Sequence, residues 1–142
     1  MRVLSALILA SAVAACSTPK PVDVLTGEAC WRCRQPISDA RLAAEVMASN
    51  GVASKFRTIH CMSTWLGQQA APPDGRIYVT DYATGKWLSA ESAVYVHTVV
   101  NRKTMERDFL AFATAEAAAK AADGAPLVGW DTVLRAGREQ PM

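Results

Sequence analysis

The sequence predicts an α+β protein in which two small ββαβ units pack together, each with a short sheet and one helix. Two observations lead to this prediction. A strand–strand–helix–strand pattern occurs twice along the chain, and 51% of the residues are hydrophobic, which is enough for a real core. The repeat is one of layout and is weak in sequence. We place the first unit at residues 30–82 and the second at residues 83–142.

The first unit is predicted from a turn signal and a helical stripe. An Asn50-Gly51 pair separates two short segments that suit strands. Ile59, Met62 and Leu66 then recur at helical spacing, and a Pro-Pro-Asp-Gly sequence ends that pattern. We expect strands over residues 41–47 and 53–58, a helix over residues 59–70 and a strand over residues 76–82.

The second unit repeats this order after a linking stretch, residues 83–92, which we expect to be a turn. Thr114 is a typical helix N-cap, and Glu116 and Lys120 suit the two ends of the helix dipole. The segment AVYVHTVV is rich in β-branched residues, as strands are. We expect strands over residues 93–100 and 108–113, a helix over residues 115–122, a strand over residues 126–130 and a short closing helix over residues 131–134.

The N-terminal segment predicts export and a lipid anchor. Residues 1–15 combine one Arg with a short apolar stretch, which is typical of a signal peptide, and small residues precede Cys16 as in a bacterial lipoprotein signal. An ordinary secreted protein, or a disulfide at Cys16, is the alternative. We expect an extracytoplasmic lipoprotein, acylated with a chain such as palmitate at Cys16 and held to a membrane by it. Ser17 favours the periplasmic face of an outer membrane, if the organism has one, and residues 16–29 suit a flexible tether.

Charge and motifs exclude several classes of function. The formal net charge is +2, with no run of like charges, so a nucleic-acid partner is not expected. The sequence has no Gly-rich phosphate loop, no serine in a nucleophile elbow and no His-Glu-x-x-His motif. We therefore expect a protein without catalytic residues. Soft-ligand chemistry is the one chemistry that stands out.

Three cysteines remain after Cys16, and an odd number argues against a framework of disulfides alone. Cys30 and Cys33 form a Cys-x-x-Cys pair that can chelate a soft ion or close into a disulfide. Arg34 stands where a covalent haem site needs histidine, and the pair does not lie between a strand and a helix as in thioredoxins. A metal site and a structural disulfide stay open.

Further donors lie elsewhere in the chain. Cys61, near the start of the first predicted helix, should have a lowered thiol pKa and suits a ligand or a nucleophile, although it also suits a small buried residue. Its neighbour His60 points in another direction on a helix. Met105 lies in a polar turn and offers a thioether, which suits Cu(I), although a loop methionine often has no such role. His97 is expected to be an ordinary strand histidine.

The order of these residues resembles that of the NosL-type lipoproteins, the copper chaperones that accompany nitrous oxide reductase. The likeness spans about Cys30 to Leu134. It is carried by Cys30-x-x-Cys33, Pro36-Ile37-Ser38-Asp39-x-Arg41-x-Ala43-Ala44-Glu45, Phe56-x-x-Ile59-x-Cys61, Asp81-Tyr82-x-Thr84-Gly85-x-Trp87-Leu88-x-Ala90, Ala93-x-Tyr95-Val96, and Met105 with Leu110-Ala111-Phe112-Ala113 and Ala117–Ala122 behind it.

This resemblance implies a lipid-anchored protein that binds one Cu(I) ion through cysteine and methionine and passes it to an apo copper enzyme, such as nitrous oxide reductase or another cupro-protein. The family's first metal block runs Cys-x-Met, which places Cys33 at the cysteine and Gln35 at the methionine. Cys30 is the natural substitute, and the late methionine maps to Met105. The implied ligands are Cys30, Cys33 and Met105, with Cys61 or His60 as a further donor. Zn(II) is an alternative metal, and thiol–disulfide chemistry at Cys30 and Cys33, with Cys61 as the resolving thiol, is the alternative function.

Overall fold

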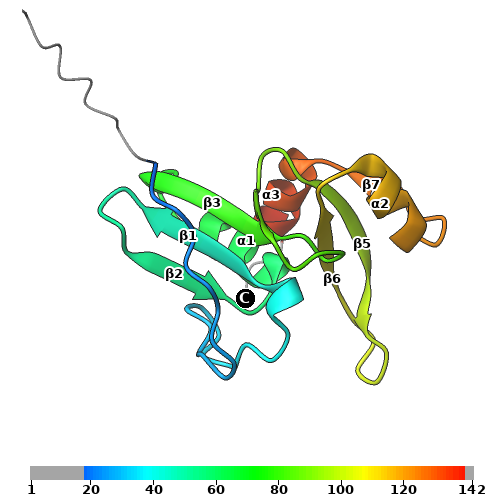
Figure 1. The fold of residues 1–142 in the computed structure, drawn as a ribbon, viewed down its shortest axis with the longest axis horizontal. Coiled ribbons are helices and arrows are strands. Elements are labelled where there is room, and N and C mark those ends of the chain that lie inside the picture. Colours follow the sequence, from blue (N-terminus) through cyan, green and yellow to red (C-terminus); the bar gives the residue numbers. More distant parts are fainter. Residues whose placement is uncertain (1–17, 140–142) are drawn as a thin grey trace, which may run out of the picture.

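The computed structural model describes residues 18–139 and contains two antiparallel sheets with three α-helices (Figure 1). The first unit consists of β1 (Ala44–Ala48), β2 (Ala53–Phe56), α1 (Ile59–Gly67) and β3 (Gly75–Thr80), preceded by a 3-10 turn, η1 (Ala40–Leu42). The second unit consists of β5 (Val94–Asn101), β6 (Glu106–Phe112), α2 (Ala115–Ala121) and β7 (Leu127–Val128). The predicted α+β class is confirmed.

The two units share one strand topology. In each, the first strand is central, the second strand pairs with one of its edges, and the third strand, which follows the helix, pairs with the other edge. The sheet orders are β2-β1-β3-β4 and β6-β5-β7, and all neighbouring strands are antiparallel. The repeat seen in the layout of the sequence is therefore also a repeat of the fold.

A short sequence motif marks equivalent positions in the two units. Phe56 ends β2 and Phe112 ends β6, and each is followed two residues later by a threonine that caps the next helix. The side chain of Thr58 accepts a hydrogen bond from the backbone N–H of Cys61, and Thr114 accepts one from Ala117. Both caps satisfy an N–H that the first helical turn leaves free. Cys61 and Ala117 are thus equivalent positions.

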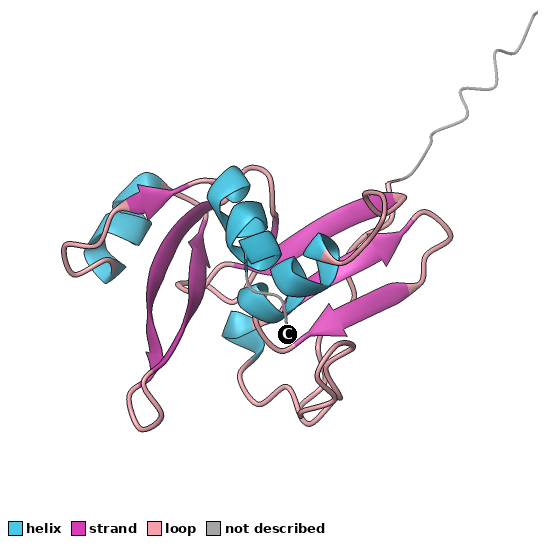
Figure 2. Ribbon diagram, turned by 180° about the vertical axis from the view of Figure 1, so that it is seen from behind, coloured by secondary structure: helices cyan, strands magenta, loops and turns pink. Residues whose placement is uncertain are grey.

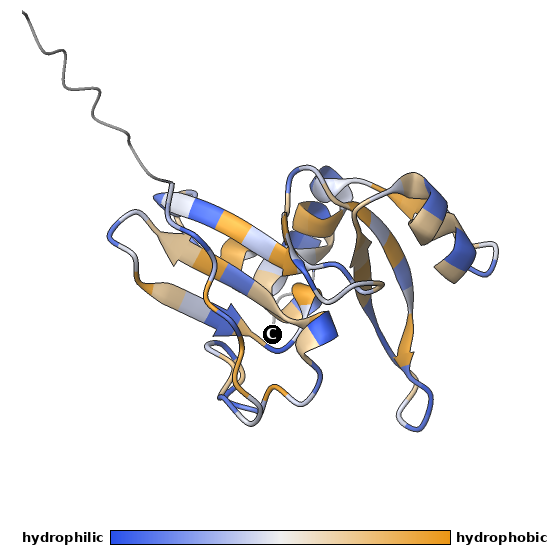
Figure 3. Cartoon of the chain, viewed as in Figure 1, coloured by the Kyte–Doolittle hydropathy of each residue, from blue (hydrophilic) through white to orange (hydrophobic). Residues whose placement is uncertain are grey.

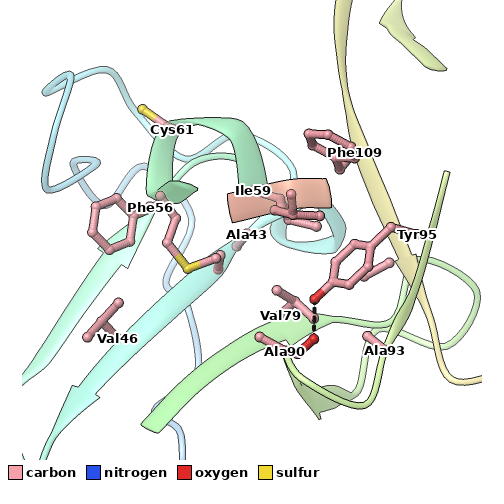
Figure 4. Close-up of a cluster of buried hydrophobic side chains, with 14 of the residues drawn as sticks. Ala43, Val46, Phe56, Ile59, Cys61, Val79, Ala90, Ala93, Tyr95 and Phe109 are labelled. Carbon is pink, nitrogen blue, oxygen red and sulfur yellow. Dashed lines mark hydrogen bonds between the residues drawn. The ribbon is translucent and has the colours of Figure 1, made fainter. Parts of the chain in front are cut away.

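The main core lies between the two sheets, and sheet β6-β5-β7 is buried on both faces. Tyr95 and Phe109 face the first unit, where they meet Ile59 (Figure 4), whereas Val96 and Leu110 face α2. The hydroxyl of the buried Tyr95 donates to the carbonyl of Ala90 at 2.6 Å, so its polar end is satisfied. Because side chains alternate along a strand, β5 and β6 supply both clusters.

The structure differs from the prediction at three elements. Residues 40–42 form the 3-10 turn η1 where the predicted strand over residues 41–47 was to begin. The linking stretch predicted as a turn contains β4 (Trp87–Ser89), which pairs with β3. The closing helix α3 spans Trp130–Glu139 and crosses onto α1, in front of the sheet in Figure 2. The crossing is close because Gly137 lies against the Ser63 carbonyl, where an added Cβ would lie 2.2 Å from the oxygen. Helix α3 of the second unit therefore completes the helical layer of the first.

The sequence suggested a free tether over residues 16–29, but residues 19–28 are hydrogen-bonded across the face of sheet β2-β1-β3-β4 opposite α1 (blue in Figure 1). We call residues 19–28 the strap. Three side chains in direct cross-strand register hold it: Tyr78 donates to the Pro19 carbonyl, Glu45 accepts from the Val22 N–H, and Lys55 donates to the Asp23 carbonyl. Composition alone did not reveal these partners because they lie on strands distant in sequence.

The predicted signal peptide, residues 1–15, and Cys16 lie outside the described residues. Within residues 18–139, no helix has both the length and the apolar character needed to cross a bilayer.

Candidate metal centre

The loop that carries Cys30 and Cys33 is built by backbone hydrogen bonds where the strap ends. The Cys30 N–H donates to the Gln35 carbonyl at 2.9 Å, and the Arg34 N–H donates back to the Cys30 carbonyl at 3.0 Å. Arg34 adopts a positive φ of 62°, which turns the chain sharply after Cys33. Trp31 donates its N–H to the Lys55 carbonyl at 2.7 Å, which fixes the loop to the end of β2.

Cys61 reaches the same place from α1. Its backbone N–H is bound by the capping side chain of Thr58 at 3.2 Å, so the first turn of the helix is fixed where the chain leaves β2. The residue before Cys61, His60, donates its backbone N–H to the carboxyl of Asp108 on β6 at 2.9 Å. The position of Cys61 therefore depends on both units.

The three sulfur atoms lie within 4.8 Å of one another, and the Sγ atoms of Cys30 and Cys61 are 3.6 Å apart. Cys30 is fully buried, Cys61 is nearly so, and Cys33 is half-buried. All three are free thiols in the structure. Three converging sulfurs with one side less buried form a soft, low-coordinate site of the kind that Cu(I) accepts.

The Sγ atoms of Cys30 and Cys61 are close enough for a thiol–thiol hydrogen bond in which either sulfur could be the donor. The hydrogen bond from Cys61 lowers the pKa of Cys30 well below its ordinary value, and the backbone N–H groups of Cys33, Arg57 and Arg32 add to this effect. The same hydrogen bond, together with burial, raises the pKa of Cys61. The lowered pKa predicted for Cys61 from its helix terminus is therefore wrong, because the close contact with Cys30 outweighs the helix dipole.

Arg32 lies over the cluster from within the same loop. Its Nη1 atom is 3.9 Å from the Sγ atom of Cys61, and its Nε atom is buried without a hydrogen-bond partner. The guanidinium is thus placed to stabilise negative charge on the sulfurs. Arg34, by contrast, extends outward and stacks on the exposed ring of Trp31, 5.3 Å from its centroid.

A cavity of about 290 Å³ opens at the less buried side of the sulfur cluster. Cys33, Cys61 and His60 line it, and β6 supplies its opposite wall. The carboxyl of Asp108 in that wall accepts hydrogen bonds from the backbone N–H groups of His60 and Phe109, at 2.9 and 2.7 Å. Burial raises the pKa of Asp108. This carboxyl joins the start of α1 to β6 and shapes the cavity.

Of the residues proposed from the sequence, the structure brings Cys30, Cys33 and Cys61 together and places His60 at the adjoining cavity. Met105 lies in the turn between β5 and β6, is 65% exposed, has a positive φ of 55°, and is not among the residues that line this cavity. Its neighbour Glu106 does line the cavity. His97 is exposed and stacks on Phe109, as expected for a strand residue without a ligand role.

The sequence analysis missed the residues that surround the sulfurs. Arg57 and Glu106, from different units, form an ion pair beside the cavity. The hydrogen bond that the His60 N–H of α1 donates to Asp108 was also not foreseen. No local pattern predicts pairs separated by almost fifty residues, and the weak repeat was the one signal that could have placed β6 next to α1.

The comparison with known families agrees with this geometry. A family model described as NosL matches residues 21–131, which is most of the chain. The chain belongs to the NosL family. No curated protein matches the sequence.

The NosL family consists of copper-binding accessory proteins and is not a family of known enzymes. The donors of this member suit a soft metal ion, since its cluster consists of three thiols with no carboxylate among them. The matched region includes residues 21–28 of the strap, the sulfur cluster and both sheets. Membership in the family and the gathered thiols together support a metal-binding role.

Proposed function

We propose that this NosL-family protein binds one Cu(I) ion as cargo at Cys30, Cys33 and Cys61 and delivers it to an extracytoplasmic copper enzyme such as nitrous oxide reductase. The proposal depends on one observation above all: three sulfurs from two distant segments lie within 4.8 Å of one another. A structural role would not need three unpaired thiols at one point. Thiolates are soft, and d¹⁰ Cu(I) accepts two or three of them without strict geometric demands.

The different exposure of the three cysteines supports delivery as well as binding. Cys30 and Cys61 are buried, whereas Cys33 is half-buried and lines the cavity. A ligand of the acceptor protein can therefore approach the metal from the Cys33 side before the buried sulfurs release the metal. Met105 and His60 stay candidate donors for such an intermediate, because both lie in or next to segments that border the cavity.

A titration tests the binding site. Reduced protein titrated with Cu(I) against a competing chelator should contain one tight site, and a Cys30→Ser/Cys33→Ser variant should lose it. Met105→Leu should bind with little change, because Met105 is exposed and does not line the cavity beside the sulfurs. Unchanged binding in the double cysteine variant would reject the proposed ligands. A parallel titration with Zn(II) tests the alternative metal, since Zn(II) also binds thiolates but favours four ligands.

Thiol–disulfide chemistry is the second candidate function, favoured by the 3.6 Å between the Sγ atoms of Cys30 and Cys61. This contact makes Cys30 and Cys61 the expected pair on oxidation, in place of Cys30 and Cys33. Peptide mapping after mild oxidation identifies the pair that forms. Reductase activity on a mixed disulfide, together with no tight Cu(I) site, would favour this function over copper delivery.

We also propose that Cys16 is lipidated and anchors the protein to a membrane on its extracytoplasmic side. The support is the sequence of residues 1–16, which matches a lipoprotein signal. Detergent phase partitioning of the expressed protein should place it in the detergent phase, and Cys16→Ala should move it to the aqueous phase. An unchanged distribution of the variant would exclude this anchor.

A further inference from the structure

We propose that the cavity beside the sulfur cluster, together with the cationic turn between β5 and β6, is a docking face for an acidic surface of the protein that accepts the copper ion. This inference rests on the proposed function and adds the chemical character of the partner. Its basis is the positive charge that gathers beside the sulfurs in the described part of the chain.

Two neighbouring cavities, of about 290 and 430 Å³, share Arg57, Thr58 and Glu106 in their walls. The first touches Cys33 and Cys61, and the second extends to the β5–β6 turn. They therefore form one continuous face that runs from the metal site to the turn. Five cationic side chains line this face: Arg32, Arg57, Arg102, Lys103 and Arg107.

The carboxylates on this face are already engaged. Glu106 pairs with Arg57, Asp39 pairs with Arg41 at 2.8 Å, and Asp108 is buried and hydrogen-bonded to backbone N–H groups. Within residues 18–139, no carboxylate forms a salt bridge with the other four cations of the face. The positive charge of these four side chains is therefore not compensated within the protein, and an acidic partner would complement it.

The turn is suited to meet a partner. Arg102 and Lys103 are exposed, and the turn is a hydrophilic projection from the end of the hairpin (Figure 3). The Arg57–Glu106 ion pair fixes the turn end of the hairpin beside the cavity. A partner that rests on this turn would face Cys33, the most accessible of the three sulfurs.

The width of the face favours a protein over a small ligand. A small anionic thiol would be held by the guanidinium groups next to the sulfurs, Arg32 and Arg57, and would leave Arg102 and Lys103 unused. These two side chains line the neighbouring cavity, beyond the one that touches the sulfurs. An effect of Arg102 and Lys103 on copper transfer would therefore distinguish a protein partner from a small anionic thiol.

Two synthetic acceptor peptides test the proposal. They share one Cys-x-x-Cys copper-binding core, and one is flanked by glutamates whereas the other is flanked by lysines. Stopped-flow measurement of Cu(I) transfer from the loaded protein should show roughly ten-fold faster transfer to the acidic peptide at low salt. This advantage should fall away at about 0.5 M salt, where the Debye length is only a few ångströms.

Matched variants locate the effect on the face. Arg102→Glu/Lys103→Glu should abolish the preference for the acidic peptide, and Arg102→Gln/Lys103→Gln should reduce it. Arg76→Glu/Lys86→Glu changes the net charge by the same amount at exposed positions outside the face and should keep the preference. Equal rates for both peptides, or an unchanged preference in Arg102→Glu/Lys103→Glu, would overturn the proposal. Free glutathione provides a further control. If it abolished the preference for the acidic peptide equally in the wild type and in that variant, the ligand would be a small anionic thiol, and the proposal would also be overturned.

A metal-free measurement separates this proposal from the proposed function. Fluorescence anisotropy of the two labelled peptides with the reduced, copper-free protein should show tighter binding of the acidic peptide, again lost in Arg102→Glu/Lys103→Glu. If the protein held no Cu(I) but kept this preference, copper delivery would fail and the docking face would stand. Tight Cu(I) binding without any peptide preference would overturn the docking face and leave copper delivery intact.

Discussion

The two units have the same strand topology and the same Phe-x-Thr motif before the helix, yet within residues 18–139 the cysteines lie only in the first. At the third helical position the first unit has Cys61 and the second has Ala117. Only in the first unit does a loop deliver Cys30 and Cys33 to that helical turn. The repeated fold therefore provides a fixed helix start, and the preceding loop decides whether this start becomes a metal site.

The second unit contributes to the same site by supporting it. Asp108 and Glu106 of β6 bind the start of α1 and Arg57, and α3 covers α1 from the other side. The first unit thus supplies the proposed ligands, and the second holds the helix that carries one of them. Substitutions should therefore have their largest effects at the proposed metal ligands and their smallest effects at the strap.

Exchanging the residues at the equivalent positions tests the division most directly. Cys61→Ala should weaken Cu(I) binding roughly a thousand-fold, about 4 kcal/mol, because it removes one of three buried sulfur ligands. Ala117→Cys should add no tight site, since no other thiol lies near α2 in the described residues. Competition titrations measure both. Wild-type affinity in Cys61→Ala would show that Cys61 is not a ligand.

The crossing of α3 over α1 is the second test. Gly137→Ala should lower the free energy of unfolding by about 3 kcal/mol, because the new Cβ meets the Ser63 backbone at 2.2 Å. Gly129→Ala is the matched control, since an added Cβ there meets nothing within 4 Å. Urea denaturation measures both variants. Equal stability of the two would mean that α1 does not need this close packing.

The two capping threonines should differ in their contribution to stability. Thr114→Ala loses a helix cap and should cost about 1 kcal/mol. Thr58→Ala should cost about 2 kcal/mol, because Thr58 is itself buried and its hydroxyl also stabilises the charged form of the buried Asp108 carboxyl. Thr58→Ser keeps the hydroxyl and should restore most of the loss. Equal effects at positions 58 and 114 would contradict a special link between Thr58 and the second unit.

The strap should give the smallest effects, and they should depend on pH. The Leu25 N–H and then Lys55 hold the pKa of Glu28 below its ordinary value of 4.5, so its contribution is present above that value and is lost as the pH falls through the folded pKa. Glu28→Gln should therefore cost a few tenths of a kcal/mol at neutral pH and less at about pH 3. Urea titrations at both pH values measure this difference.

Glu45 should show the opposite sign. Burial raises its pKa, so the stability that its neutral form provides is present at low pH and is lost as the pH rises through the folded pKa. Glu45→Gln should therefore become more stable relative to the wild type as the pH rises from about 4 to 7. A difference that does not change with pH would show that Glu45 is no less ionised when folded than when unfolded.

Local patterns predicted much of this fold. Helical spacing in the segment that became α1, and the threonine cap of α2, gave the start of each helix, and the Asn50-Gly51 turn separates β1 from β2 as expected. These features depend on neighbours a few residues apart, which the sequence displays directly. β4 was missed because a three-residue strand has too little periodicity to detect.

The amino-acid sequence alone established the kind of chemistry, because an odd set of soft donors and no other motif leaves few alternatives, and it indicated the family. Which donors meet depends on tertiary structure, which brought Cys61 to Cys30, left Met105 in an exposed turn, placed Arg32 over the sulfurs, and laid the supposed tether across the sheet. Most of these contacts join residues tens of positions apart. Sheet register and helix packing fix such distances, and no local pattern in the sequence records them.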